Sequence, residues 1–156
     1  MMFEINQGNR KVQLKPRLGF YSTQDFMGNE LPGLAIVLDE IKRGKVADEY
    51  AVLTVNFGEF IGLKNSAYID INNCGFIAEQ LFQYDVAEPT QFTKESGFCS
   101  YPLWLFKESF LKEIGGETYQ KYSDIYDSYM NRTLYEENDK EMEGQENQNL
   151  QENQSL

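Results

Sequence analysis

The 156-residue chain contains no histidine, and this absence excludes much chemistry. Ser-His-Asp and Cys-His hydrolases are excluded, as is every metal site that depends on an imidazole ligand. Because the chain has only two cysteines, a zinc ion would need carboxylates in addition to both thiolates. The sequence also lacks the GxxxxGK[ST] loop, the GxGxxG turn, the CxxC pair and the DxDxDG calcium loop.

Long apolar runs are absent as well. The sequence has no stretch of about 18 apolar residues, the length that a helix needs to cross a bilayer. The N-terminal sequence MMFEINQGNRK lacks the apolar segment of a secretory signal. We therefore expect a cytoplasmic protein with reduced cysteines, no cofactor and no membrane contact.

Basic residues are scarce after the first third of the chain. Residues 1–50 contain seven Lys/Arg and seven Asp/Glu, whereas residues 51–156 contain seven and eighteen and hold the whole net charge of −11. Such a surface repels nucleic acid and anionic lipid and attracts basic proteins, so we expect no direct nucleic-acid binding. Solubility alone also explains an acidic composition.

Several segments have the alternating or continuous apolar pattern of β-strands. They are residues 2–6, 11–17, 34–41, 50–57, 67–71 and 98–106. The turn residues NQGNR join the first two, and Pro16 indicates a strand edge or exit. The runs 34–41 and 50–57 are expected to pair across the connection 42–49. Gly, Pro and polar residues predict loops at 28–33 and 87–97.

Helical patterns follow in the second half of the chain. The spacing of apolar residues predicts a helix over 75–84, and a short helix over 107–114 is expected to stop at Gly115 and Gly116. Four tyrosines at steps of three, four and three residues predict a helix over 117–135. The Glu/Asn/Gln-rich residues 136–156 cannot bury enough apolar area to fold, so we expect disorder there.

This order of elements predicts an α+β fold. We expect a mainly antiparallel sheet with helices on one face, a C-terminal helix and a disordered acidic tail. The expected division is a core domain over 1–114, a Tyr-rich helix over 115–135 and a tail over 136–156.

One stretch resembles a reactive centre. It consists of Asp70, Asn72, Asn73 and Cys74, with Cys99 as a conceivable redox partner. A helix N-terminus lowers the pKa of a thiol, but a nucleophilic cysteine also needs a base, and histidine is missing. The alternative interpretation, which we favour, is that Asp70 and the asparagines cap the helix and Cys74 packs as a small apolar residue.

The tyrosine-bearing helix is the candidate partner-binding surface. The residues concerned are Tyr119, Tyr122, Asp124, Tyr126, Asp127 and Tyr129. Tyrosine is enriched among the residues that dominate binding energy, and the two aspartates would suit a basic partner. The alternative is that the tyrosines only dock the last helix onto the sheet.

Three sequence blocks together resemble a domain family of unknown function. They are YAVLTVNF at 50–57, AYIDINNCGFIAEQL at 67–81 and SGFCSYPLWLF at 96–106. The family is found on conjugative elements and plasmids of low-GC Gram-positive bacteria, and the resemblance extends from Leu34 to Leu111. No catalytic residue can be transferred from it. It implies a mobile-element protein, and small acidic cargo of such elements often acts against host defences.

Two functional hypotheses follow, both for a protein that is not an enzyme. The first is an anti-CRISPR or anti-restriction protein that binds the basic nucleic-acid-binding surface of a Cas9-type effector or a restriction enzyme. The second is an accessory or adaptor protein of conjugation or plasmid maintenance that binds a protein partner. An enzyme with a carboxylate or thiol centre at Asp70 and Cys74 is a third, less favoured hypothesis.

Overall fold

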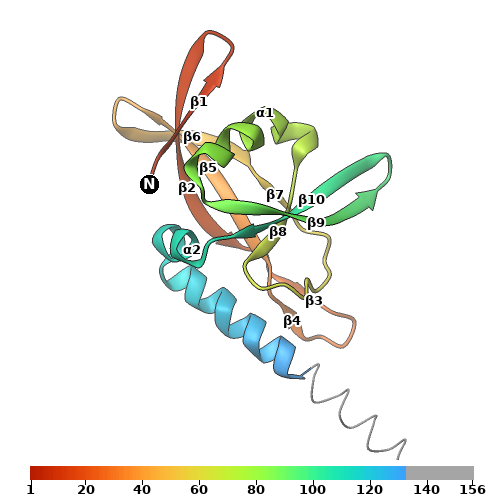
Figure 1. The fold of residues 1–156 in the computed structure, drawn as a ribbon. Helices are drawn as coiled ribbons and strands as arrows, with labels where there is room; N and C mark the ends of the chain where they lie inside the picture. The colour runs from red at the N-terminus through yellow and green to blue at the C-terminus, as the bar shows by residue number, and fades with distance from the viewer. Residues whose placement is uncertain (133–156) are drawn as a thin grey trace, which may run out of the picture.

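A computed structural model describes residues 1–132, so the predicted tail and the predicted end of the last helix lie outside the described residues. The α+β fold with mainly antiparallel strands is confirmed (Figure 1). The first sheet has the order β1 (Phe3–Gln7), β2 (Arg10–Phe20), β5 (Leu34–Lys42), β6 (Lys45–Val52). The second has the order β7 (Thr54–Val55), β8 (Ser66–Ile69), β10 (Cys99–Phe106), β9 (Ala87–Ser96).

The remaining elements surround these sheets. They are the hairpin β3 (Thr23–Gln24) and β4 (Glu30–Leu31), the helix α1 (Ile71–Leu81), the 3-10 turn η1 (Phe82–Tyr84) and the helix α2 (Glu108–Gly115). A C-terminal helix follows and is helical over 117–132. In Figure 1 it runs from α2 towards the β3–β4 hairpin.

The strand predicted over 50–57 is divided between the two sheets. Leu53 separates β6 from β7, and its N–H donates to the carbonyl of Ile36 at 2.9 Å. The carbonyl of Leu53 accepts a hydrogen bond from the N–H of Asp70, also at 2.9 Å. Leu53 therefore links the first sheet to the start of α1, and the sequence did not predict this crossing.

Two segments predicted as connections are strands. β6 begins at Lys45, because Arg43 and Gly44 adopt positive φ angles of 55° and 75° and form a two-residue hairpin turn. The predicted loop 87–97 is mostly the strand β9, which pairs with β10 across a turn at Gly97. The predicted loop 28–33 likewise includes β4. β6 and β9 lie at sheet edges with few buried side chains, so their sequences lack the apolar alternation of half-buried strands.

Helix α1 begins four residues before the predicted start at Gly75. Asp70 is the N-cap, as expected, and accepts hydrogen bonds from the N–H and the side-chain amide of Asn73. The prediction that the asparagines are caps is wrong, because both lie inside the first turn of the helix. The helix is irregular at Cys74, whose φ of −120° is not helical.

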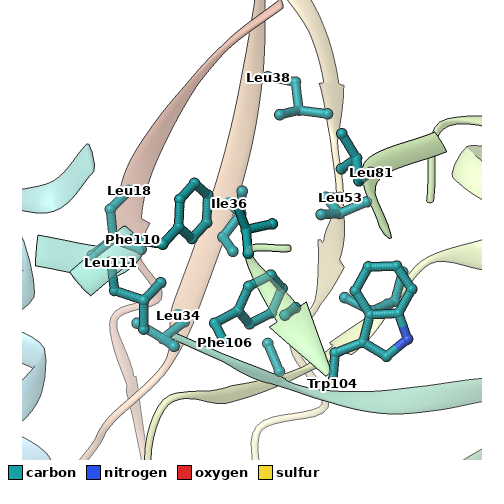
Figure 2. Packing of buried hydrophobic residues seen from close by; sticks show 14 of the residues in the cluster. Leu18, Leu34, Ile36, Leu38, Leu53, Leu81, Trp104, Phe106, Phe110 and Leu111 are labelled. Carbon is teal, nitrogen blue, oxygen red and sulfur yellow. The ribbon is translucent and has the colours of Figure 1, made fainter. Parts of the chain in front are cut away.

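The core lies between the two sheets and beneath the helices. Figure 2 shows side chains from both sheets, α1 and α2 converging there. The labelled residues are Leu18, Leu34, Ile36, Leu38, Leu53, Leu81, Trp104, Phe106, Phe110 and Leu111. Three tyrosines of the C-terminal helix join the same cluster, so this helix is packed onto the core domain. A Cβ on Gly115 would lie 2.5 Å from Leu18 Cδ2, so the end of α2 needs glycine to approach β2 this closely.

Candidate functional site

The predicted tyrosine stripe faces inward over most of its length. Tyr119, Tyr122 and Tyr126 are buried, and only Tyr129 is partly exposed. Tyr119, Tyr122 and Tyr126 therefore dock the C-terminal helix onto the core, as the alternative interpretation expected, and are not available to a partner. Their position gives them a second role, because two of their hydroxyl groups bind the loop that precedes β8.

Asn65 is the residue of this loop that the tyrosines hold. The hydroxyl of Tyr122 accepts a hydrogen bond from the N–H of Asn65 at 3.0 Å, and the hydroxyl of Tyr119 donates to Asn65 Oδ1 at 2.9 Å. Asn65 has a φ of +68°, an uncommon conformation that asparagine tolerates better than most residues. Burial raises the pKa of Tyr122 and, together with nearby Glu108, that of Tyr119. Both phenols therefore stay neutral and act as hydrogen-bonding groups.

Ring contacts and an ion pair fix the rest of the loop. The ring centroid of Phe60 lies 5.3 Å from that of Tyr126 and 4.6 Å from that of Tyr129. Lys64 Nζ lies 3.0 Å from an oxygen of Asp127 and 5.8 Å from the ring centroid of Tyr126. The C-terminal helix thus holds residues 57–65 against the outer face of the second sheet.

This loop and the sheet enclose a groove of about 470 Å³, which we call the aromatic groove. Its lining residues are Phe60, Ile61, Gly62, Leu63, Tyr68, Phe92, Thr93 and Leu103. Tyr68 and Leu103 are directly opposite each other on β8 and β10 and share one face of the sheet. Phe92 of the edge strand β9 is 58% exposed. An apolar groove with an exposed aromatic side chain is typical of a binding site.

The aromatic surface continues beside the groove. The ring centroid of Phe57 lies 5.5 Å from that of Tyr68 and 5.1 Å from that of Tyr101, and both contacts are edge-to-face. Lys94 Nζ lies 5.5 Å from the centroid of Phe57 and forms an ion pair with Glu59. Both lysines near the groove, Lys64 and Lys94, therefore have acidic partners.

Part of the predicted reactive centre gathers around Tyr101. Burial raises the pKa of Tyr101, the nearby Cys99 thiol and the charge of Asp70 raise it further, and Asn72 acts to lower it. Asp70, Asn72 and Cys99 are thus brought together around Tyr101. Asp70 and Asn73 are engaged in the helix cap described above.

Cys74 does not have the properties of a nucleophile. It is buried, its Sγ donates to the carbonyl of Val52 at 3.5 Å, and burial followed by the charge of Asp70 raises the pKa of its thiol. Cys74 thus fits the favoured interpretation of a packed, small apolar residue, and not the alternative in which the helix N-terminus lowers the pKa of the thiol. Cys74 and Cys99 are both free thiols. Within residues 1–132, acidic and cysteine side chains form no group of three or more that could hold a metal ion.

A second concavity lies beside the exposed part of the C-terminal helix. This carboxylate hollow, about 260 Å³, is lined by Glu30, Asp124, Ile125, Ser128, Tyr129 and Arg132. The hydroxyl of Tyr129 donates to Asp25 Oδ2 at 3.0 Å and joins the β3–β4 hairpin to the helix. Because Tyr129 also contacts Phe60, the hollow adjoins the aromatic groove. The predicted residues Asp124 and Tyr129 thus line the hollow, Tyr129 contacts the groove wall at Phe60, and Asp127 holds this wall through Lys64.

Sequence reasoning missed the residues that shape the groove. Phe60 lies in an irregular loop, and Phe92 lies in a segment predicted as a loop. No signal in the sequence singles them out, because single exposed aromatic residues are common on folded chains, and Phe98 is one that does not line the groove.

Comparison with known proteins gives one match. The profile of a domain of unknown function, DUF4313, matches residues 21–126, which include both walls of the aromatic groove and the tyrosines that hold Asn65. No curated protein and no solved structure matches the chain. Within residues 1–132, no helix is both long enough and apolar enough to cross a membrane. Because the profile matches more than half of the sequence, the protein belongs to the DUF4313 family.

Proposed function

We propose that the protein acts by binding another protein at the aromatic groove and the adjoining carboxylate hollow, and that it catalyses no reaction. The observation that supports this most is Phe92, an aromatic side chain that is 58% exposed at the rim of an apolar groove. Aromatic residues in such positions dominate the binding energy of many protein interfaces. Glu30 and Asp124 outnumber Arg132 among the residues that line the hollow, which leaves net negative charge next to this apolar surface.

The candidate catalytic groups support the same conclusion. Cys74 is buried with a raised thiol pKa, and the carboxylate of Asp70 is occupied as a helix cap. The chain has no histidine to act as a base for either group. An arrangement that only binds accounts for all of these residues without a chemical step.

The partner that we propose is a nuclease of a host defence system, either a Cas9-type effector or a restriction enzyme. Such nucleases have basic surfaces that bind the nucleic-acid backbone. A protein of net charge −11 is attracted to these surfaces. The resemblance of the three sequence blocks to a mobile-element family supports the same target, because such elements benefit when host nucleases are blocked.

The apolar character of the groove favours a second candidate function, an adaptor in conjugation or plasmid maintenance. An adaptor needs no basic partner, so its binding would change little with salt. An inhibitor that competes with nucleic acid would bind more weakly as salt screens its acidic surface. Binding measured at low and high ionic strength separates the two.

The direct test is plasmid survival in cells with an active CRISPR or restriction system. The wild-type protein is expected to increase survival, and Phe92→Ala is expected to weaken target binding about tenfold or more and reduce this protection. The matched control is Phe98→Ala, because Phe98 is fully exposed at the tip of the same hairpin and does not line the groove. Equal protection by the two variants, or no protection by the wild type, would refute the proposal.

A further inference from the structure

A second apolar groove lies on the opposite face of the second sheet. This α1 groove, about 520 Å³, is lined by Ile71, Gly75, Phe76, Ala78, Glu79, Phe82, Pro102 and Trp104. Leu103 lines the aromatic groove and Trp104 lines the α1 groove, and consecutive residues of a strand point to opposite faces. The two grooves are therefore separated by the sheet and can be occupied at the same time.

Helix α1 and the turn after it expose large apolar side chains along this groove. Ile71, Phe76 and Phe82 are 40%, 44% and 43% exposed. The inner face of the same helix is buried in the core. The ring centroids of Trp104 and Phe82 are 4.4 Å apart, and Trp104 is buried beneath Phe82. Phe82 follows Ile71 by eleven positions, a span of about 16 Å for a helix, so the lining of the groove extends over about three turns.

The elements that line the α1 groove have no basic residue. Residues 65–93 and 95–106 contain no Lys or Arg, whereas the first of these stretches contains Asp70, Glu79, Asp85 and Glu88. Asp85 is paired with Lys107, but Glu79 at the groove forms no ion pair within residues 1–132. The groove is thus apolar inside and negative at its rim.

We propose that the α1 groove binds an amphipathic helix of another protein, with apolar side chains over Trp104 and a Lys or Arg facing Glu79. A helix fits because apolar residues at positions i, i+4, i+7 and i+11 extend over about 16 Å, the same three turns over which α1 lines the groove. The basic residue is required because Glu79 would otherwise lie next to the partner without a counter-charge. This site is independent of the aromatic groove and makes the protein able to join two partners.

Charge argues against two other occupants. A second copy of the chain also has a net charge of −11, and a symmetric pairing would place the two Glu79 side chains near each other. Residues 133–156 contain seven acidic residues and one lysine, so the rim does not attract them either. A basic, apolar helix matches both properties of the groove.

Trp104 is the only tryptophan in the chain and lines this groove, so it is the single donor for energy transfer, and variants in the two grooves show which groove the acceptor occupies. The probe is a synthetic helical peptide of about 15 residues with a Leu stripe, flanking Lys residues, no Trp and a dansyl group that accepts energy from Trp104. We expect saturable energy transfer with the full-length protein. Phe76→Ala should weaken binding about tenfold or more, whereas Phe92→Ala, in the other groove, should leave it unchanged.

The charge requirement is tested separately. A matched peptide with Glu in place of Lys should bind more weakly, and Glu79→Lys should reverse this preference. Circular dichroism and urea unfolding check that each variant is folded. If Phe76→Ala does not fold, the charge preference of Glu79→Lys still tests the site, because this substitution is on the surface.

Three results would overturn the proposal. The first is no energy transfer at saturating peptide, and the second is an equal loss of binding in Phe76→Ala and Phe92→Ala. The third is a doubled mass of the wild-type protein in light scattering that returns to the monomer mass in Phe76→Ala, because the groove would then be an interface between copies of this chain.

Discussion

The replacement Tyr122→Phe tests how the C-terminal helix holds the wall of the aromatic groove. Tyr122 is buried, and the centroid of its ring lies 6.1 Å from the ring centroids of both Tyr119 and Tyr126. Phenylalanine keeps these ring contacts and removes only the hydroxyl that accepts the N–H of Asn65 at 3.0 Å. A half-buried donor left without a partner costs about 1–3 kcal/mol, so the free energy of unfolding should fall by that amount.

Urea unfolding at pH 7 measures this loss. With a urea dependence of roughly 1–3 kcal/mol per molar, the midpoint should fall by about 1 M while the slope stays unchanged. An unchanged slope shows that the variant unfolds from the same compact state. A loss below about 0.5 kcal/mol, the range of an ordinary surface substitution, would refute the role given to this hydroxyl.

The same variant has an expected alkaline signature. Burial raises the pKa of Tyr122 above its ordinary value of 10, so the folded state favours the neutral phenol. Its contribution to stability is complete below pH 10 and is lost as the pH rises through the raised value. Wild-type stability should therefore fall above pH 10, and Tyr122→Phe should make this fall shallower. If the free energy of unfolding falls equally steeply above pH 10 in the two proteins, the raised pKa assigned to buried Tyr122 is contradicted.

Three further predictions concern other parts of the fold. Asp70→Ala removes the N-cap of α1 and should lower the free energy of unfolding by about 0.5–2 kcal/mol in the same urea assay. Burial acts to raise the pKa of Asp25, but hydrogen bonds from Asn29, Tyr129 and Met27 outweigh it and lower the pKa below 3.8. Stability from Asp25 is thus present above pH 3.8 and lost as the pH falls, and Asp25→Asn should flatten this acid-side loss in thermal melts. Phe98→Ala should change stability by less than about 0.5 kcal/mol, because this side chain is fully exposed.

Strands with one buried face could be predicted from the sequence. Val12, Leu14 and Leu18 of β2 are buried and alternate with exposed residues, and this alternation is the signal of a half-buried strand. Pro16 is expected to mark a strand edge or exit, and the edge is found on one side of β2. β1 pairs with β2 only as far as Leu14, so among the described residues the side of Pro16 that faces away from β5 has no partner strand. β6 and β9 could not be predicted in this way, since their strand conformation depends on turn geometry and on a paired neighbour.

The site was less predictable than the fold. The period of the tyrosines gives the helix face that they share, but only the packed neighbours decide whether this face is buried. The aromatic groove needs the strand order β8–β10–β9, which places Phe92 beside residues far from it in the sequence. It also needs the contacts of Asn65 and Phe60 with the C-terminal helix, across more than 50 positions of the chain. Such contacts leave no local pattern.

The most direct test of the central claim is photo-crosslinking in cells. A photoreactive phenylalanine analogue is placed at position 92, in the aromatic groove, or at position 98, at the exposed hairpin tip, in cells in which the protein protects plasmids from a nuclease-based defence. Binding at the groove predicts a crosslink to a defence nuclease from position 92 and none from position 98. Full protection without any protein crosslinked to position 92 would contradict the claim.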